Sequence, residues 1–146
     1  MRRGLLRAAT ILVVGMLAIQ LVPYGRDHTN PPITGEPPWD SAATRELAAT
    51  ACFDCHSNET VWPWCSNIAP LSWRVQRNVD EGRARLNLSE WGTRDQAAGE
   101  IVEVVSEGEM PPWDYLILHP DARLSDADTQ ALVDGLSKTF GAAPVP

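Results

Sequence analysis

Two cysteines and a histidine stand together in the segment Cys52-Phe53-Asp54-Cys55-His56. The spacing C-x-x-C-H is the pattern by which a haem is attached covalently to a protein. The two thiols add across the two vinyl groups at one edge of the haem, and the adjacent imidazole turns beneath the ring to bind the iron. The sequence therefore predicts Cys52 and Cys55 as attachment points and His56 as an iron ligand.

A redox disulfide or a zinc site would draw on the same residues. A C-x-x-C disulfide of the thioredoxin type belongs to a βαβ context, which this sequence does not show. Zinc could be bound by Cys52, Cys55 and Cys65 together with His56 or His119. Both alternatives stay open, and the histidine directly after the second cysteine favours haem.

The iron of such a haem needs a second axial ligand or keeps an open position. Met110 is the one methionine outside the N-terminal segment, and it stands in Glu107-Gly108-Glu109-Met110-Pro111-Pro112. The glycine permits a tight turn and the prolines stiffen the loop, so the thioether would be presented at a fixed place. A thioether opposite a histidine raises the haem potential and suits electron transfer. His119 is the competing ligand, although the neighbouring Pro120 suggests a structural turn.

Cys65 is left over once the two cysteines of the motif carry a haem. We expect it to be a small buried residue, with a free thiol or an intermolecular disulfide as the alternatives. Trp62, Trp64 and Trp73 follow the motif closely and could wall the haem or donate to a propionate. Ordinary core packing would explain each of them equally well.

Residues 1–22 have the composition of an export segment. Arg2, Arg3 and Arg7 come first, and an apolar run broken only by Gln20 follows, which is typical of a secretory signal. The run ends without a small-x-small cleavage site. We therefore expect an uncleaved, single-pass anchor in the bacterial cytoplasmic membrane, with a cleaved signal and a soluble periplasmic protein as the alternative. The positive-inside rule places the rest of the chain on the periplasmic, extracytoplasmic side.

The rest of the chain divides into a linker, one domain and a tail. Residues 23–39 hold five prolines and are predicted to form an extended, semi-rigid spacer in which His28 is solvated. Residues 40–140 are expected to form the haem-binding domain, and residues 141–146 a loose tail.

The formal net charge is −7, and it is more negative still without the three arginines of the export segment. This balance excludes nucleic acid as the partner, because phosphate binding needs a basic face. It suits docking to a basic surface on a redox partner protein. Solubility alone would also explain it.

Four helices and no strand are expected in the domain. They run from Asp40 or Ser41 to about Ala51, from Pro70 to about Arg85, from Thr93 to Gly108, and from Ser125 to Phe140. Capping residues, the proline at a helix start and apolar side chains at helical spacing indicate these bounds. The stretch between the first two helices is expected to be irregular. The predicted fold class is all-α.

Several longer runs carry a resemblance to a known family. They are Asn30-Pro31-Pro32, Cys52 to Thr60, Trp62-Pro63-Trp64, Ser66 to Pro70, Ser72-Trp73, Glu81-Gly82-Arg83, Leu86-Asn87, Ser89-Glu90-Trp91, Gly108 to Pro111, His119-Pro120 and Ala122 to Ser125. Over residues 17 to 140 the chain resembles the haem-binding domain family of small bacterial mono-haem c-type cytochromes. Cys65 is a departure, since this family usually has an aromatic residue there.

The resemblance implies a class I cytochrome c-like helical domain around one covalent haem c, with the first and last helices of the domain crossing. It implies His56 as the proximal and Met110 as the distal iron ligand. A backbone carbonyl near Ala69 and Pro70 is expected to accept a hydrogen bond from the second nitrogen of His56. The expected function is electron transfer without enzymatic activity. The alternative is a haem-based sensor, or a peroxide- or oxygen-reactive haem protein, with an open distal site.

Overall fold

The computed structural model describes residues 2–92 and 98–141. Its helices are α1 (Arg2–Ile19), α2 (Ala42–Ala51), α3 (Phe53–His56), α4 (Leu71–Arg85), α5 (Ile101–Ser106), α6 (Tyr115–Leu118) and α7 (Asp126–Phe140), with the 3₁₀ turns η1 (Trp64–Asn67), η2 (Ala98–Glu100) and η3 (Pro120–Ala122). Within the described residues there is no strand, and β structure is limited to one isolated bridge between Gly35 and Glu90. The prediction of an all-α chain is confirmed.

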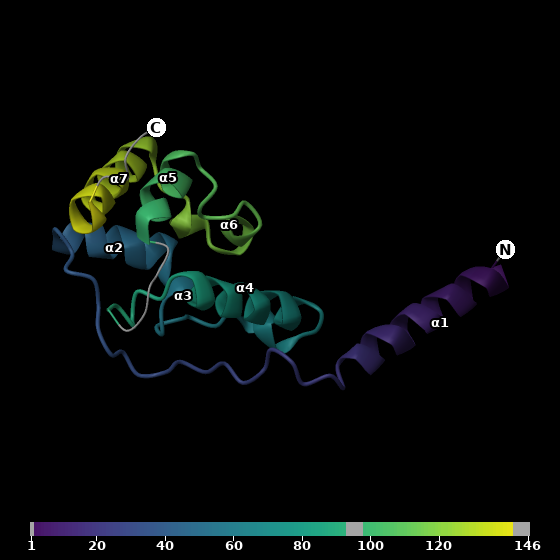
Figure 1. Cartoon of the computed structure of the whole chain (residues 1–146). Helices are drawn as coiled ribbons and strands as arrows, with labels where there is room; N and C mark the ends of the chain where they lie inside the picture. The colour runs from purple at the N-terminus through teal and green to yellow at the C-terminus, as the bar shows by residue number, and fades with distance from the viewer. Residues whose placement is uncertain (1, 93–97, 142–146) are drawn as a thin grey trace.

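The two ends of the domain are joined through α2 and α7. Each helix begins at a serine cap: the Ser41 hydroxyl accepts from the Thr44 N–H at 3.1 Å, and the Ser125 hydroxyl accepts from the Asp128 N–H at 3.2 Å. The helices pack closely because Gly135 leaves room for Thr44, with which a Cβ at this position would collide. Figure 1 shows α7 against α2 on the side of the molecule away from α1.

The hydrophobic core lies where α2, α3, α5 and α7 meet. Its buried members are Ala48, Phe53, Leu86, Leu88, Ile101, Val105, Leu132 and Leu136. Phe53 stands inside the C-x-x-C-H motif, so the segment that carries the motif is anchored in the core. Burial of this kind is the main favourable term in folding, and it fixes α3 relative to the longer helices.

Two of the four predicted domain helices, α2 and α4, have nearly the predicted bounds, and α7 begins at its predicted cap and ends at Phe140. The stretch after α2 is less irregular than expected, because it holds α3 and η1. Of the helix expected from Thr93, residues 93–97 lie outside the described residues, and the described part is η2 followed by the short α5. The four-residue α6 was not predicted, since one turn is too short to show helical periodicity.

Residues 23–39 are extended, as predicted, but they lie along the domain instead of forming a free spacer. The N–H groups of Thr34 and Gly35 donate to the Ser89 carbonyl at 2.9 and 3.2 Å, and the Trp91 N–H donates to the Gly35 carbonyl at 3.0 Å. A proline-rich segment cannot satisfy its backbone groups internally, and these bonds to the domain satisfy several of them.

The prediction of a solvated His28 was wrong. Its ring is half-buried and stacks on Trp62 with 4.8 Å between the ring centroids. Its Nε2 lies 3.1 Å from the Ser66 carbonyl oxygen. His28 therefore ties the linker to the segment that follows the cysteine motif, and the aromatic partner explains why a linker position has a histidine.

Helix α1 leads away from the domain, and none of its described side chains is buried (Figure 1). It contains the three arginines Arg2, Arg3 and Arg7 as well as the apolar run. Among the described residues, no helix has both the length and the apolar character needed to cross a membrane. The expectation of a membrane-anchor helix in residues 1–22 therefore has no support from the fold.

Candidate functional site

The cysteine motif forms a single helical turn at the end of α2. Cys52 closes α2 by donating its N–H to the Ala48 carbonyl at 2.8 Å, and it also begins α3. Its carbonyl accepts from the N–H groups of Cys55 and His56 at 3.2 and 2.9 Å. Residues three and four apart share one face of such a turn. The local structure therefore brings both thiols and the imidazole into one turn, with Cys52 against the core and Cys55 at the cavity described below.

The imidazole of His56 is held by the C-terminal end of α4. Its Nδ1 lies 3.1 Å from the Gly82 carbonyl oxygen and 3.2 Å from the Leu86 carbonyl oxygen. Both partners are acceptors, so Nδ1 carries the proton and Nε2 keeps its lone pair. Burial lowers the pKa of His56, which favours the neutral ring. A neutral imidazole with its lone pair on Nε2 is the form that binds a metal ion.

The expected partner of His56 near Ala69 and Pro70 was wrong. The Ala69 carbonyl instead accepts a hydrogen bond of 2.9 Å from the side-chain amide of Gln20. The physical reason lies at Gly82, where a Cβ would collide with the Cys55 carbonyl. Without a side chain at this position, α3 packs directly on α4, and His56 meets the carbonyl groups of the last turns of that helix.

Both motif cysteines are free thiols and are half-buried. Burial raises the pKa of Cys52 to about 12. Burial, followed by the negative charge of Asp54, raises the pKa of Cys55 to about 11. These thiols are therefore protonated at neutral pH, and a simple thiolate metal site receives no help from its surroundings. Among the described residues, no group of three or more His, Cys, Asp or Glu side chains is arranged to hold a metal ion, so the zinc alternative gains no support.

A cavity of about 330 Å³ opens beside the motif. Asp54 and Cys55 line it from α3, Val75 and Val79 line it from α4, and residues 115–119 close the opposite side. Its size falls near the lower end of the range for sites that bind small molecules, about 300–1,000 Å³. Four further lining residues are apolar and yet 45–74% exposed; they are Val61, Leu71, Ile117 and Leu118. Apolar side chains gathered in this way mark a surface that a ligand covers.

Met110, the predicted second ligand, is half-buried and packs against the core cluster, as Cys52 does. Its N–H donates to the Val104 carbonyl at 3.1 Å, which fixes the loop after α5. The structure thus brings Met110 and Cys52 to the same core. The described residues that line the cavity include His119 and not Met110.

His119 and Tyr115 connect the far wall of the cavity to the motif. The two rings stack with their centroids 3.9 Å apart. The Tyr115 hydroxyl donates to Asp54 Oδ2 at 2.7 Å, and His119 Nε2 lies 3.6 Å from the same oxygen. Burial, followed by the bond to Asp54, raises the pKa of Tyr115 above its ordinary range. The turn that Pro120 predicted is present as η3, but His119 itself faces the motif.

Cys65 is buried, as expected, with 1% of its surface exposed. It is a free thiol and lines the same cavity as Cys55.

Sequence reasoning missed three residues of this site: Asp54, Gly82 and Tyr115. The first stands between the two cysteines, where the haem pattern accepts any residue, so the pattern gave no signal for it. Gly82 stands inside a predicted helix, and an internal glycine is itself a sign of close packing. Nothing in the sequence around Tyr115 indicates that its hydroxyl reaches Asp54.

Comparison with known protein families supplies the remaining observation. The model of the haem-binding domain family matches residues 14–138 of the chain. The chain belongs to the haem-binding domain family. No curated protein and no solved structure matches it.

The residues of this haem-binding domain fit the group that the family implies. Cys52, Cys55 and His56 stand in one turn, and the bonds of His56 Nδ1 leave Nε2 as the ring atom that could bind iron. Of these three residues, Cys55 is the one that lines the cavity among the described residues. The cavity beside Cys55 is lined mainly by apolar side chains, several of them exposed. The apolar ring of a haem would cover these side chains. The chain is therefore a haem-binding protein on both the family match and the chemistry of its site.

Proposed function

We propose that this haem-binding domain is a mono-haem c-type cytochrome that transfers electrons on the outer side of the bacterial cytoplasmic membrane. Cys52 and Cys55 would hold haem c through thioether bonds, and His56 would bind its iron. The observation that carries the proposal is the turn Cys52–His56, which holds two thiols and an imidazole oriented by carbonyls of α4. The close packing of α2 on α7 supports a class I cytochrome c-like arrangement.

When bound, the haem supplies an iron that gains and loses one electron. The rest of the mechanism belongs to the side chains of the domain. The Gly82 and Leu86 carbonyls accept the Nδ1 proton of His56, so Nε2 would be the atom that binds the iron. These hydrogen bonds also fix the orientation of the ring and raise the basicity of Nε2. Val75 and Val79 keep water away from the cavity wall. Electron transfer requires no covalent chemistry on a substrate, so we propose a carrier and not an enzyme.

Met110 is the proposed second iron ligand. It is the one methionine of the domain, and its loop is tied to α5 through the Val104 carbonyl. A thioether ligand stabilises the reduced iron and raises the potential, which suits a carrier. Its half-buried position against the core supports this role, since a ligand on a loosely held loop would exchange readily with water.

The partner and the location complete the proposal. Residues 98–141 carry nine acidic residues and two basic ones, which supports docking to a basic surface on a redox partner protein. The basic and apolar composition of residues 2–22 supports export, with the haem domain on the periplasmic side. The exposed apolar side chains of α1 support attachment to the membrane through this helix, and a cleaved signal is the alternative.

One observation favours a second candidate, a haem-based sensor or a peroxide- or oxygen-reactive haem protein. His119 lines the cavity beside Cys55, whereas Met110 does not. If Met110 stays in the core, the distal iron position would be open or would be taken by His119. A ligand such as oxygen could then bind to the iron.

The test is expression of the full chain with export, followed by two measurements. Haem staining that survives denaturing electrophoresis is expected if Cys52 and Cys55 are covalently attached; loss of the stain would overturn the c-type assignment. The oxidised protein should show the far-red absorption band of His–Met haem. If that band is absent and the reduced protein binds carbon monoxide readily, the second candidate replaces the carrier.

A further inference from the structure

The base of α1 is fastened to the turn that precedes α4. The side-chain amide of Gln20 donates to the Ala69 carbonyl at 2.9 Å and accepts from the Ala69 N–H at 3.0 Å. Further along the chain, Gly25 lies directly against α4: its φ is +80°, and a Cβ would collide with the Ser72 carbonyl. Helix α1 therefore has a defined position relative to α4, although none of its own side chains is buried.

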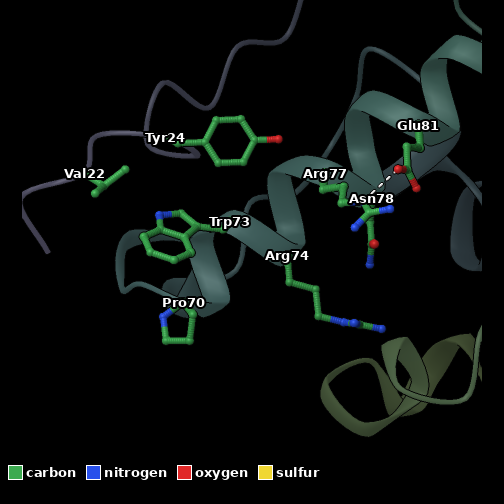
Figure 2. Close-up of a pocket in the computed structure, with 8 residues that line it drawn as sticks. All are labelled: Val22, Tyr24, Pro70, Trp73, Arg74, Arg77, Asn78 and Glu81. Atoms are coloured by element: carbon green, nitrogen blue, oxygen red, sulfur yellow. Dashed lines mark hydrogen bonds and ion pairs between the residues drawn. The ribbon is translucent and has the colours of Figure 1, made fainter. Parts of the chain in front are cut away.

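A groove of about 680 Å³ lies beside this junction, between α4 and the chain that follows α1. Figure 2 shows Val22, Tyr24 and Trp73 at the end nearest to α1, with Arg77 towards the other end and Arg74 extending from α4. Tyrosine and tryptophan have an apolar body and a polar tip, and proteins concentrate them where hydrocarbon meets water. Arginine beside them supplies a donor for phosphate.

Both arginines pair with carboxylates, and the pair of Arg77 is exposed on both sides. Arg77 pairs with Glu81 at 2.7 Å, and the two side chains are 71% and 62% exposed. Arg74 pairs with Asp114; the arginine side chain is 63% exposed and the aspartate side chain 19%. Exposed ion pairs contribute little stability, because water screens them and holding two long side chains costs entropy. A phosphate group in the groove could therefore replace Glu81 at Arg77 with little loss of stability, and it could approach Arg74 from its exposed side.

The indole nitrogen of Trp73 is buried and has no hydrogen-bond partner among the described residues. In Figure 2 this nitrogen lies on the edge of the ring that faces Val22 and Tyr24. Leaving a buried N–H without an acceptor is unfavourable. The indole N–H is therefore an unused donor beside this end of the groove.

Exposed apolar side chains lie around the groove. The end of the molecule that contains α1 is basic. Leu21, Val22 and Ile68 are 84%, 44% and 44% exposed at the junction. Residues 2–26 carry four arginines and no acidic residue, whereas residues 98–141 are strongly acidic. Figure 1 shows α5 and α7 at the opposite end from α1. A negatively charged lipid surface would attract the end with α1 and repel the other.

We propose that the groove between Tyr24, Trp73, Arg74 and Arg77 binds the headgroup of an anionic phospholipid. The occupant is a lipid of the membrane surface that α1 contacts, and the bound headgroup holds α4 against that surface. The acidic α5 and α7 then face away from the membrane, towards the solvent. This inference rests on the proposed membrane-side location and is independent of which residue binds the iron.

The test compares two double variants of the full-length haem-loaded chain. Arg74→Gln with Arg77→Gln removes the two positive charges of the groove. Arg85→Gln with Arg123→Gln removes the same net charge from exposed positions elsewhere. Binding is measured by flotation with vesicles of phosphatidylcholine, with and without phosphatidylglycerol. The groove variant should lose affinity for the phosphatidylglycerol vesicles by about fivefold for each arginine, and the control variant should change by less than about twofold.

An equal loss in the two variants would overturn the proposal, because general electrostatics would then explain the binding. No loss in the groove variant would overturn it as well, since α1 alone would account for attachment. Release of the wild-type chain by inorganic phosphate, at an ionic strength matched with sodium chloride, would assign the groove to a free anion instead. The haem spectrum of each sample is recorded separately, so failure of the cytochrome assignment is distinguishable from failure of lipid binding.

Discussion

The carboxylate of Asp54 accepts a hydrogen bond of 2.7 Å from the hydroxyl of Tyr115, across 61 residues of sequence. Asp54 stands between the two cysteines of the motif, and its other oxygen accepts from the Val61 N–H at 2.8 Å. The bond therefore links the turn that carries the cysteines to α6. Because α6 follows the loop of Met110, the hydrogen bond between Tyr115 and Asp54 restrains that loop relative to the motif.

Replacing Tyr115 by phenylalanine removes this bond and keeps the ring. We expect the free energy of unfolding of the haem-loaded protein to fall by about 1.5–3 kcal/mol, since the acceptor is a charged and largely buried group. Urea unfolding measures this change. Tyr24→Phe is the matched control: its hydroxyl donates to Asp80 at 3.3 Å in an exposed position and should cost less than about 0.5 kcal/mol. Equal losses of stability in the two variants would mean that the hydrogen bond to Asp54 contributes no more than an exposed one.

The same tyrosine predicts a dependence on alkaline pH. Its pKa in the folded protein is raised above the ordinary value of 10.0, first by burial and then by the bond to Asp54. A group with a raised folded pKa stabilises the fold below its unfolded pKa, and the contribution is lost as pH rises through the folded value. Wild type should therefore lose stability relative to Tyr115→Phe above about pH 10. A stability difference that stays constant from pH 8 to pH 11 would contradict the prediction.

Gly82 gives a prediction about the packing of α3 on α4. A Cβ at this position would collide with the Cys55 carbonyl, so Gly82→Ala should push the motif away from α4 and weaken the bond to His56 Nδ1. We expect a loss of about 1–3 kcal/mol in stability and a shift of the haem potential. Gly99→Ala is the control, because a Cβ there meets nothing within 4 Å. An unchanged potential in Gly82→Ala would show that the carbonyl does not tune His56.

The turn of the cysteine motif and the starts of α2 and α7 were predictable from sequence because their causes are local. Ser41 and Ser125 cap helices through bonds to residues three positions on, and such bonds depend on neighbouring residues alone. The spacing of Cys52, Cys55 and His56 is equally local. All three therefore share one turn, as a haem site requires.

The partners of the site residues were not predictable, because they depend on which distant segments pack together. The Ala69 carbonyl, expected to accept a hydrogen bond from His56, instead accepts one from the side chain of Gln20. Gln20 and Ala69 are 49 residues apart in the sequence. The linker was expected to stand free because its composition disfavours helix. Composition gives no information on backbone bonds to another segment, such as those that Thr34 makes to Ser89.

The raised pKa values of the two motif thiols predict how the chain behaves without haem. With pKa values of about 12 for Cys52 and about 11 for Cys55, both thiols are almost fully protonated at pH 8. Iodoacetamide should therefore label them at least tenfold more slowly in the native apoprotein than in urea, since the thiolate is the reactive form. Mass spectrometry of the labelled peptides measures both rates. Equally fast labelling in buffer would show that these residues adopt the described turn only after haem attachment.

The choice of iron ligand can be tested with Met110→Ala and His119→Ala side by side. If Met110 is the ligand, its removal should leave haem attached, lower the reduction potential and abolish the far-red band, because the thioether no longer stabilises reduced iron. His119→Ala should then leave both the band and the potential nearly unchanged. Its ring contacts only Tyr115 and Asp54 among the partners seen in the structure. Loss of the band in His119→Ala alone would identify the cavity histidine as the ligand, and Met110 would be a core residue.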